Sequence, residues 1–248
     1  MKIKVAQTPK ELGKASGSAA ATLIRNSIAA NGSANIILAT GTSQFETLNQ
    51  LIVEQEIEWS NVVMFHLDEY IGLPITHAAS FRKYLTERFL SKVPALKEAH
   101  LINGEINTQM ECKRLSDLIT QYAIDVALVG IGENGHLAFN DPPADFDTEQ
   151  PYIIVELDDL CRNQQFGEGW FKSLDEVPRR AISMSVKQIL KAKNIICAVP
   201  DQRKAIAVRN CNERPLSNLF PASALQSHPS CIYYLDKDSA SLLSEKKF

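Results

Sequence analysis

The sequence predicts one α/β domain, residues 1–248, built on a largely parallel, Rossmann-like sheet with helices on both faces. Short apolar runs of strand length alternate along the chain with longer segments of helical period. The apolar runs are nearly continuous, which is typical of strands buried on both faces of a parallel sheet. No internal repeat, low-complexity stretch or linker divides the 248 residues, so we predict a single domain.

The predicted strands are runs of aliphatic and β-branched residues that end in polar residues or glycine. They cover residues 34–40, 62–66, 126–130, 153–157, 181–185, 195–199 and 231–235. Helical spacing places Leu48, Leu51 and Ile52 on one face of a segment spanning 45–54, and the same spacing recurs over 80–90. Further helices are predicted at 187–192 and 202–212.

Composition excludes several classes of protein. Lys plus Arg number 26 and Asp plus Glu 29, a formal net charge of −3. A nucleic-acid-binding protein is normally basic, so we predict no such partner. No apolar run approaches the ~20 residues that span a bilayer, and the first residues lack a secretory signal. We therefore predict no membrane contact and a cytoplasmic location.

The five cysteines are widely spaced and form neither a CxxC pair nor a zinc-like Cys/His cluster. Free cysteines commonly pack as small apolar side chains. We therefore expect them to be reduced, and we expect no bound metal.

Three segments that follow predicted strands are rich in glycine or polar residues: 39–44, 65–74 and 130–143. Open α/β sheets bind ligands at the carboxyl ends of their strands. The first segment contains Gly41, Thr42 and Ser43 between a strand and a helix, where hydroxyl and backbone N–H groups can hold a phosphate. The alternative is an ordinary turn in which Thr or Ser caps the helix.

The second segment places Asp68 and Glu69 directly after a buried strand. Neighbouring residues of an extended chain point to opposite sides, so only one of the two carboxylates is expected to face a shared pocket. The alternative is that one caps a helix and the other is solvated. His66, on the strand itself, is expected to be packed and hydrogen-bonded rather than catalytic.

The third segment has Gly130, Gly132 and Gly135 at the exit of a strand, followed by His136 and, five residues later, Asp141. The three glycines match a dinucleotide-binding pattern, but Pro residues after Asp141 interrupt the helix that this pattern requires. A histidine near a carboxylate in a glycine-lined loop favours an acid/base group oriented by its partner.

Together these segments resemble the glucosamine-6-phosphate deaminase (isomerase) family, which is related more distantly to 6-phosphogluconolactonases. The most specific motifs are Asp-Glu-Tyr, beginning at Asp68, and Gly-His-x-Ala-Phe-Asn, beginning at Gly135. The resemblance runs through 39–43, 65–74 and 130–142, and continues at 177–178, 203–205 and 225–229. Lactonases of the superfamily usually follow Gly-His with a Ser-Leu-Phe-Pro type sequence, which this chain lacks.

The resemblance implies an enzyme, both isomerase and hydrolase, that opens the ring of glucosamine 6-phosphate, isomerises it to a ketose and releases fructose 6-phosphate and ammonia. It implies that His136 opens the ring, that Asp68 moves the proton from C2 towards C1, and that Asp141 orients His136. The groups implied for substrate binding are Thr42, Ser43 and Lys204 at the phosphate and Gly41, Gly130 and Gly132 through their backbone. No metal or organic cofactor is implied, since a carboxylate and an imidazole suffice for these proton transfers.

Four departures from the family pattern affect these expectations. Asn134 stands where many members have aspartate, which implies a changed hydrogen-bond partner at the catalytic site. Asp141 replaces the usual glutamate and is one methylene shorter. The family's phosphate-gripping arginine has no counterpart at its usual place, and Arg162 is the nearest substitute. The acidic stretch 144–149 replaces the activator site of allosteric members, so no activation by an acetylated sugar phosphate is expected.

Two other functions remain open from the sequence. One is a related enzyme, either a 6-phosphogluconolactonase-like hydrolase or a galactosamine-6-phosphate isomerase. The other is a non-catalytic sugar-phosphate sensor, against which the presence of Asp68, His136 and Asp141 counts. The expected partner in each case is a small phosphorylated sugar, and homo-oligomerisation is left open.

Overall fold

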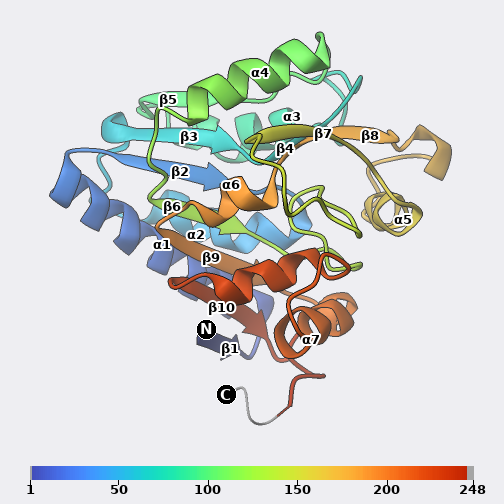
Figure 1. Ribbon diagram of the computed structural model, residues 1–248. Helices are drawn as coiled ribbons and strands as arrows, with labels where there is room; N and C mark the ends of the chain where they lie inside the picture. The colour runs from blue at the N-terminus through green and yellow to red at the C-terminus, as the bar shows by residue number, and fades with distance from the viewer. Residues whose placement is uncertain (1, 245–248) are drawn as a thin grey trace.

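The computed structural model describes residues 2–244 of the 248-residue chain. Its centre is a sheet of seven strands in the order β1-β10-β9-β6-β2-β3-β5, with parallel pairing throughout (Figure 1). The predicted parallel α/β fold is therefore confirmed. The strands are β1 (Lys2–Ala6), β2 (Ala34–Leu38), β3 (Val62–His66), β5 (Glu98–His100), β6 (Val126–Val129), β9 (Asn194–Val199) and β10 (Cys231–Asp236).

Helices cover both faces of this sheet. Ile36 and Leu38 of β2 belong to a core shared with one group of helices, whereas Ile37 between them belongs to the core on the other face. This two-sided burial explains why the strands read as continuous apolar runs. The first face carries α1 (Pro9–Asn31), α2 (Phe45–Val53) and α3 (Phe81–Arg88), and the second carries α4 (Thr108–Ile119), α6 (Val186–Leu190) and α7 (Ala205–Glu213).

Helix α1 was not predicted, although its start carries clear signals. The Thr8 hydroxyl accepts a hydrogen bond from the Glu11 N–H at 3.2 Å, and the Glu11 carboxylate accepts one from the N–H of Gln7. Gly17 of α1 lies so close to α2 that a Cβ atom there would be 2.6 Å from the Gln50 Cβ. The two helices pack with nearly touching backbones, which small residues permit.

Two of the predicted strands do not belong to the parallel sheet. β7 (Tyr152–Glu156) and β8 (Arg180–Met184) pair antiparallel, and β8 also pairs antiparallel with β4 (Asp68–Tyr70), giving a separate sheet in the order β4-β8-β7. A parallel connection needs a crossover of a dozen or more residues, usually a helix. The chain between β6 and β7 instead contains glycine and proline turns and no α-helix, so the prediction of one sheet was wrong here.

The small sheet, α5 (Asp159–Gly167) and the loops after β6 gather where the strands of the main sheet end, on the right of Figure 1. The predicted strand-end segments 39–44, 65–74 and 130–143 therefore meet at one edge. Within residues 2–244, no helix is both long and apolar enough to cross a membrane.

Candidate active site

A narrow cleft lies between the strand ends of the main sheet, the small sheet and α5. It brings together seven of the residues singled out from the sequence: Gly41, Ser43, Asp68, Gly130, Gly132, His136 and Lys204. These come from four separate stretches of the chain. The rest of the lining is formed by Ala39, Thr40, Leu67, Phe81, Ile131, Ala138, Phe139, Gln164, Gln165 and Glu168.

Asp68 and Glu69 point in different directions, as expected for neighbours on a strand. Asp68 lines the cleft, while Glu69 is fully buried and accepts hydrogen bonds from the backbone N–H groups of Phe81 and Arg82 at 3.2 and 2.7 Å. It also accepts one from the Ser80 hydroxyl at 3.0 Å. Glu69 thus holds the start of α3, where the helix dipole favours negative charge.

The Asp68 carboxyl has an unusual environment for an acid. Burial, and secondly the nearby charge of Glu69, raise the pKa of Asp68 to about 8. Within residues 2–244 no group donates a hydrogen bond to its side chain, and the carboxyl is only 6% exposed. A buried carboxyl with a pKa near neutrality can take up and release a proton under physiological conditions.

His136 and Asp141 form a hydrogen-bonded pair, with Nδ1 of the imidazole 3.0 Å from Oδ1 of the carboxylate. Burial by itself acts to raise the pKa of Asp141, but the hydrogen bond and charge of His136 outweigh it and lower the pKa below its usual value. An ionised carboxylate can only accept, so Nδ1 carries the proton. The imidazole is then oriented, and Nε2 is free for a ligand in the cleft.

Asn134 lies behind this pair and does not line the cleft. Its Nδ2 donates to Oδ1 of Asp141 at 2.9 Å and to Oδ2 of Asp158 at 3.0 Å, and its Oδ1 accepts from the His136 N–H at 3.0 Å. An amide can donate to two carboxylates at once, whereas an aspartate there could donate to neither. The sequence departure at this position therefore fits the hydrogen-bond network of this chain, and the shorter Asp141 still reaches His136.

Lys204 supplies the cleft's ammonium group. It is the last residue of a short 3-10 turn (Gln202–Lys204) that leads into α7, and its side chain is only 6% exposed. The preceding Asp201 has φ +88°, a region that non-glycine residues rarely adopt and that costs free energy. Burial lowers the pKa of Lys204, while Glu133 and Glu168 act in the opposite direction.

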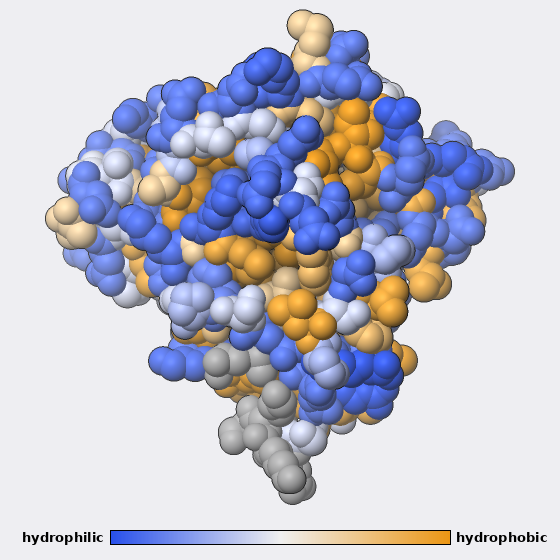
Figure 2. Space-filling view, in the orientation of Figure 1, coloured by the Kyte–Doolittle hydropathy of each residue, from blue (hydrophilic) through white to orange (hydrophobic). Residues whose placement is uncertain are grey.

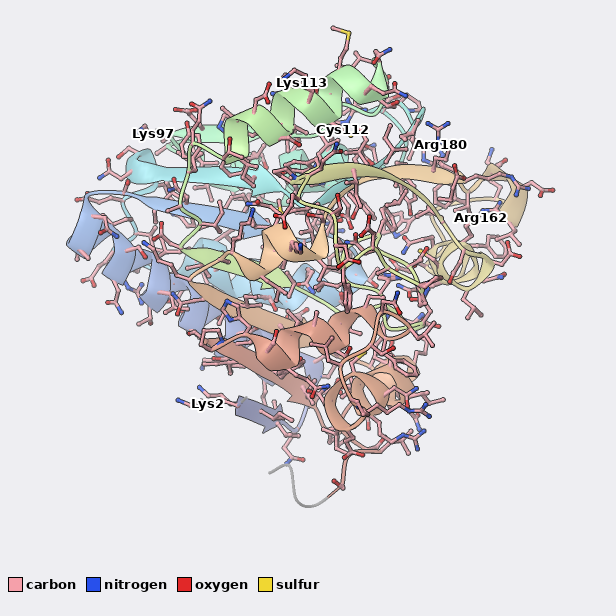
Figure 3. All side chains as sticks on the ribbon, viewed as in Figure 1. Lys2, Lys97, Cys112, Lys113, Arg162 and Arg180 are labelled. Atoms are coloured by element: carbon pink, nitrogen blue, oxygen red, sulfur yellow. The ribbon has the colours of Figure 1, made fainter. Side chains whose placement is uncertain are left out.

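Two predicted ligands lie outside the cleft. Arg162 is buried in α5 and donates hydrogen bonds to the backbone oxygens of Leu174 and Val177, at 2.7 Å from Nη2 to Leu174 (Figure 3). It therefore ties α5 to the chain that follows instead of gripping a ligand. Thr42 is not among the lining residues, although Thr40 and Ser43 on either side of it are.

The sequence reasoning missed a polar wall formed by α5. Gln165 lines the cleft and accepts a 2.7 Å hydrogen bond from the buried hydroxyl of Tyr70, and Glu168 lies one turn further along. Glu133 was also missed, although it is adjacent to Gly132 and pairs with Lys204 at 4.0 Å. The helical spacing of 165 and 168 is a detectable signal, but the direction in which the helix faces depends on the fold.

The side chains of His136, Asp141 and Cys161 offer ligand atoms within 4.8 Å of one another. Both Asp141 oxygens are already engaged, Oδ1 by His136 and Asn134 and Oδ2 by the Asp158 N–H at 2.9 Å. Burial raises the pKa of the Cys161 thiol well above its ordinary value, which opposes metal binding by its thiolate. The arrangement favours orientation of His136 over metal coordination.

A larger cavity of about 940 Å³ lies between α4 and β7. Hydrophobic side chains gather there below α4 and are bordered by hydrophilic ones (Figure 2). Asp141 reaches one wall of this cavity, but neither Asp68, His136 nor Lys204 lines it. The groups suited to proton transfer thus lie in the narrower cleft.

An open α/β sheet whose strand ends hold a carboxyl of raised pKa, an oriented imidazole and a buried lysine defines an enzyme that moves protons on an anionic substrate. A sequence profile of one such family matches residues 7–233. The chain belongs to the family of glucosamine-6-phosphate isomerases and 6-phosphogluconolactonases.

Among its relatives, a glucosamine-6-phosphate deaminase of Streptococcus pneumoniae (strain Hungary19A-6) is 34% identical over 217 residues, which is 87% of this chain and 90% of that protein. The structure is similar to that of a monomeric glucosamine-6-phosphate deaminase, with a TM-score of 0.88 and 31% identity over 98% of this chain and 100% of that one. A 6-phosphogluconolactonase of Trypanosoma brucei shares the fold, with a TM-score of 0.79 and 18% identity over 98% of each chain.

Proposed function

We propose that this protein converts glucosamine 6-phosphate to fructose 6-phosphate and ammonia. The observation that carries the proposal is the convergence of Asp68, His136 and Lys204 on one cleft. These three groups are a base, an oriented acid/base and a cation, which are the parts needed to isomerise and deaminate a phosphorylated amino sugar. The similarity to deaminases over most of the chain supports the choice of substrate.

In this proposal His136 opens the sugar ring. The imidazole Nε2 takes the proton from the C1 hydroxyl as the bond between C1 and the ring oxygen breaks, and delivers that proton to the ring oxygen. Asp141 keeps Nδ1 protonated and the ring fixed, at a distance of 3.0 Å. A positioned acid/base group of this kind contributes about 10²–10⁴-fold in rate.

Asp68 then carries out the isomerisation. Its carboxylate removes the proton from C2 and returns it to C1, while one proton of the C2 ammonium group moves to the C1 oxygen, which converts the amino aldose into the imine of the corresponding ketose. One water adds to C2 and ammonia leaves, which gives the ketose phosphate. The raised pKa of Asp68, about 8, makes the carboxylate basic enough to take a carbon-bound proton.

The phosphate is proposed to bind at Lys204, Ser43 and the turn that begins at Gly41. Gly41 has φ +90°, and no side chain caps the turn Thr42–Gln44 that follows it. Its first backbone N–H groups are therefore open to an anion, as at other helix starts. Thr42 contributes through its backbone in this arrangement, since its side chain does not line the cleft.

The cleft has room for about 60 Å³, which is smaller than the pockets of ~300 Å³ or more that hold small-molecule ligands. We therefore expect α5 to move outward when a hexose phosphate binds. This movement breaks two hydrogen bonds to α5 side chains, from the Tyr70 hydroxyl to Gln165 at 2.7 Å and from the Glu133 N–H to Gln164 at 2.8 Å.

A panel of 6-phosphosugars tests the proposal by ammonia release and by ketose formation. We expect ammonia from glucosamine 6-phosphate at a rate well above that from its galacto epimer. Turnover of 6-phosphogluconolactone alone would establish the lactonase instead, and tight binding of the amino sugar phosphate without any turnover would establish a sensor. Asp68→Asn should abolish exchange of the C2 hydrogen with solvent while leaving binding intact.

A further inference from the structure

The cleft holds an unusual balance of charge for a site that binds phosphate. Within residues 2–244 Lys204 is the one lysine or arginine among the cleft-lining residues. The two carboxylates that act most strongly on its ammonium group are Glu133, whose Oε1 lies 4.0 Å from Nζ, and Glu168, which directly follows α5. A phosphate monoester carries about −1.5 to −2 charges at neutral pH, so both carboxylates oppose its approach.

Glu133 contacts a second cation besides Lys204. The same Oε1 lies 3.6 Å from Nη1 of Arg203, the neighbouring residue in the chain. Arg203 is half exposed and is held by Asp201 through hydrogen bonds of 2.9 Å to Nε and 2.7 Å to Nη2. The Glu133 side chain is 33% exposed and so has room to move between its two cations.

We propose that Glu133 is a built-in competitor for the phosphate site, which an incoming phosphoryl group displaces from Lys204 onto Arg203. The inference rests on the proposed role of Lys204 as the phosphate ligand. An anion that reaches Lys204 forms one ion pair but breaks the pair between Lys204 and Glu133, so the net free energy of binding is small. Arg203 lowers the cost of this exchange because the displaced carboxylate remains paired.

The consequence is selectivity between tethered and free phosphate. Inorganic phosphate has no contacts other than those at Lys204 and the adjacent turn, so the competition with Glu133 leaves it weakly bound. A sugar phosphate also contacts the groups around Asp68 and His136 and binds despite the same cost. Glu133 therefore weakens the binding of the phosphate group itself. A higher concentration of free phosphate is then needed to occupy the site.

Titration calorimetry with inorganic phosphate tests this without any need for turnover. Glu133→Gln should bind phosphate about three- to fivefold more tightly than the parent, which is the effect of losing one close, partly exposed charge partner. The matched control is Glu149→Gln, which removes the same charge from an exposed pair with Lys187, 2.6 Å long and outside the cleft. That variant should bind phosphate as the parent does.

The role of Arg203 calls for a double-mutant cycle. Arg203→Met should weaken phosphate binding in the parent, opposite in sign to Glu133→Gln. In the Glu133→Gln background the same substitution should have no effect, because there is no displaced carboxylate for Arg203 to pair with. An effect of equal size in both backgrounds would mean that Arg203 acts only by holding the Asp201 turn, and would overturn the transfer of Glu133 to Arg203.

The competitor role of Glu133 is overturned if Glu133→Gln leaves the phosphate Kd within twofold of the parent, weakens binding, or still shows no measurable binding. A separate variant keeps this result distinct from a failure of the proposed function. If Lys204→Met binds phosphate as tightly as the parent, the phosphate site itself is misplaced. If Glu133→Gln tightens binding but no sugar phosphate is turned over, the inference stands and the proposed reaction does not.

Discussion

The Gly132 backbone lies against the face of the His136 imidazole: a Cβ atom on Gly132 would clash with the ring atoms Cε1, Nε2 and Cδ2. The glycine backbone lies directly against the ring, and the Gly132 N–H donates to the His136 carbonyl at 3.0 Å. Glycine is required here for space, since Gly132 is not among the glycines of positive φ. The ring is thus fixed by Asp141 at one edge and by the Gly132 backbone against one face.

Gly132→Ala should therefore displace the imidazole and lower kcat by about 100-fold, which is the usual effect of misplacing a catalytic group by about 1 Å. The matched control is Gly167→Ala at the end of α5, where an added Cβ meets nothing within 4 Å. Steady-state kinetics of the two variants compare them directly. Full activity in Gly132→Ala would show that the ring position is not critical.

Asp68→Asn should stabilise the protein at alkaline pH. The unfolded carboxyl has a pKa of about 3.9, whereas the folded one has a pKa of about 8. Between these values the folded state retains a proton that the unfolded state has lost, so stability falls as pH rises through this window.

Asparagine does not titrate, so the variant should gain ~1–3 kcal/mol at pH 8 and little at pH 4. Thermal melts at both pH values measure this gain. Asp117→Asn, at an exposed site paired with Lys113, should show no comparable trend. A gain of the same size at both pH values would rule out the raised pKa as its cause.

The pH dependence of activity should also report the ionisation of Asp68. Asp68 acts as a base only when ionised, so kcat/KM should rise with pH and level off above an apparent pKa near 8. The measurement is kcat/KM for glucosamine 6-phosphate from pH 6 to 9.5. A kcat/KM that does not rise over this pH range would mean that the carboxyl keeps an ordinary pKa.

Asn134→Asp should destabilise the protein by ~1–3 kcal/mol at pH 8, because it places a third carboxylate between Asp141 and Asp158 and removes two donated hydrogen bonds. The loss should shrink towards pH 5, where a crowded carboxyl takes up a proton. Asn107→Asp is the control, since this residue caps α4 with its side-chain oxygen and aspartate caps equally well. Equal stability of both variants would contradict the bridging role of Asn134.

Arg162→Met and Lys204→Met should separate stability from phosphate binding. Arg162 makes its hydrogen bonds to the backbone at Leu174 and Val177, so its loss should lower Tm by several degrees. Its effect on the Kd for glucitol 6-phosphate, which cannot ring-close or enolise, should stay within about threefold. Lys204→Met should weaken that binding by at least ~10-fold with little change in Tm. The reverse pattern would restore Arg162 as the phosphate ligand.

Much of the fold could be predicted from local pattern. The seven predicted strands all exist, because a short run of aliphatic and β-branched residues is a local signature that does not depend on the strand's neighbours. The sheet to which a strand belongs carries no such signature. β7 and β8 contain the same kinds of residue as β9, and only the lack of a helix between β6 and β7 separates them from the parallel sheet.

The site was predictable where residues lie next to their partners in the chain. The spacing of five between His136 and Asp141 indicates a pair within one loop, and the adjacency of Asp68 and Glu69 indicates opposite directions. Arg162 was misplaced because its helix turns that side chain inward, towards Leu174 and Val177. Glu133 reaches Lys204 across about 70 positions of the sequence, and no local pattern encodes that approach.

The two proton-transferring groups of the cleft stand on different sheets. Asp68 belongs to the small antiparallel sheet, while His136 follows a strand of the large parallel one. Their alignment therefore depends on how the two sheets pack against each other in a shared core, and a slight shift between the sheets would misalign the groups while each sheet stays folded. Activity should consequently disappear on warming before circular dichroism reports any loss of secondary structure. The loss of activity would then measure the packing between the two sheets.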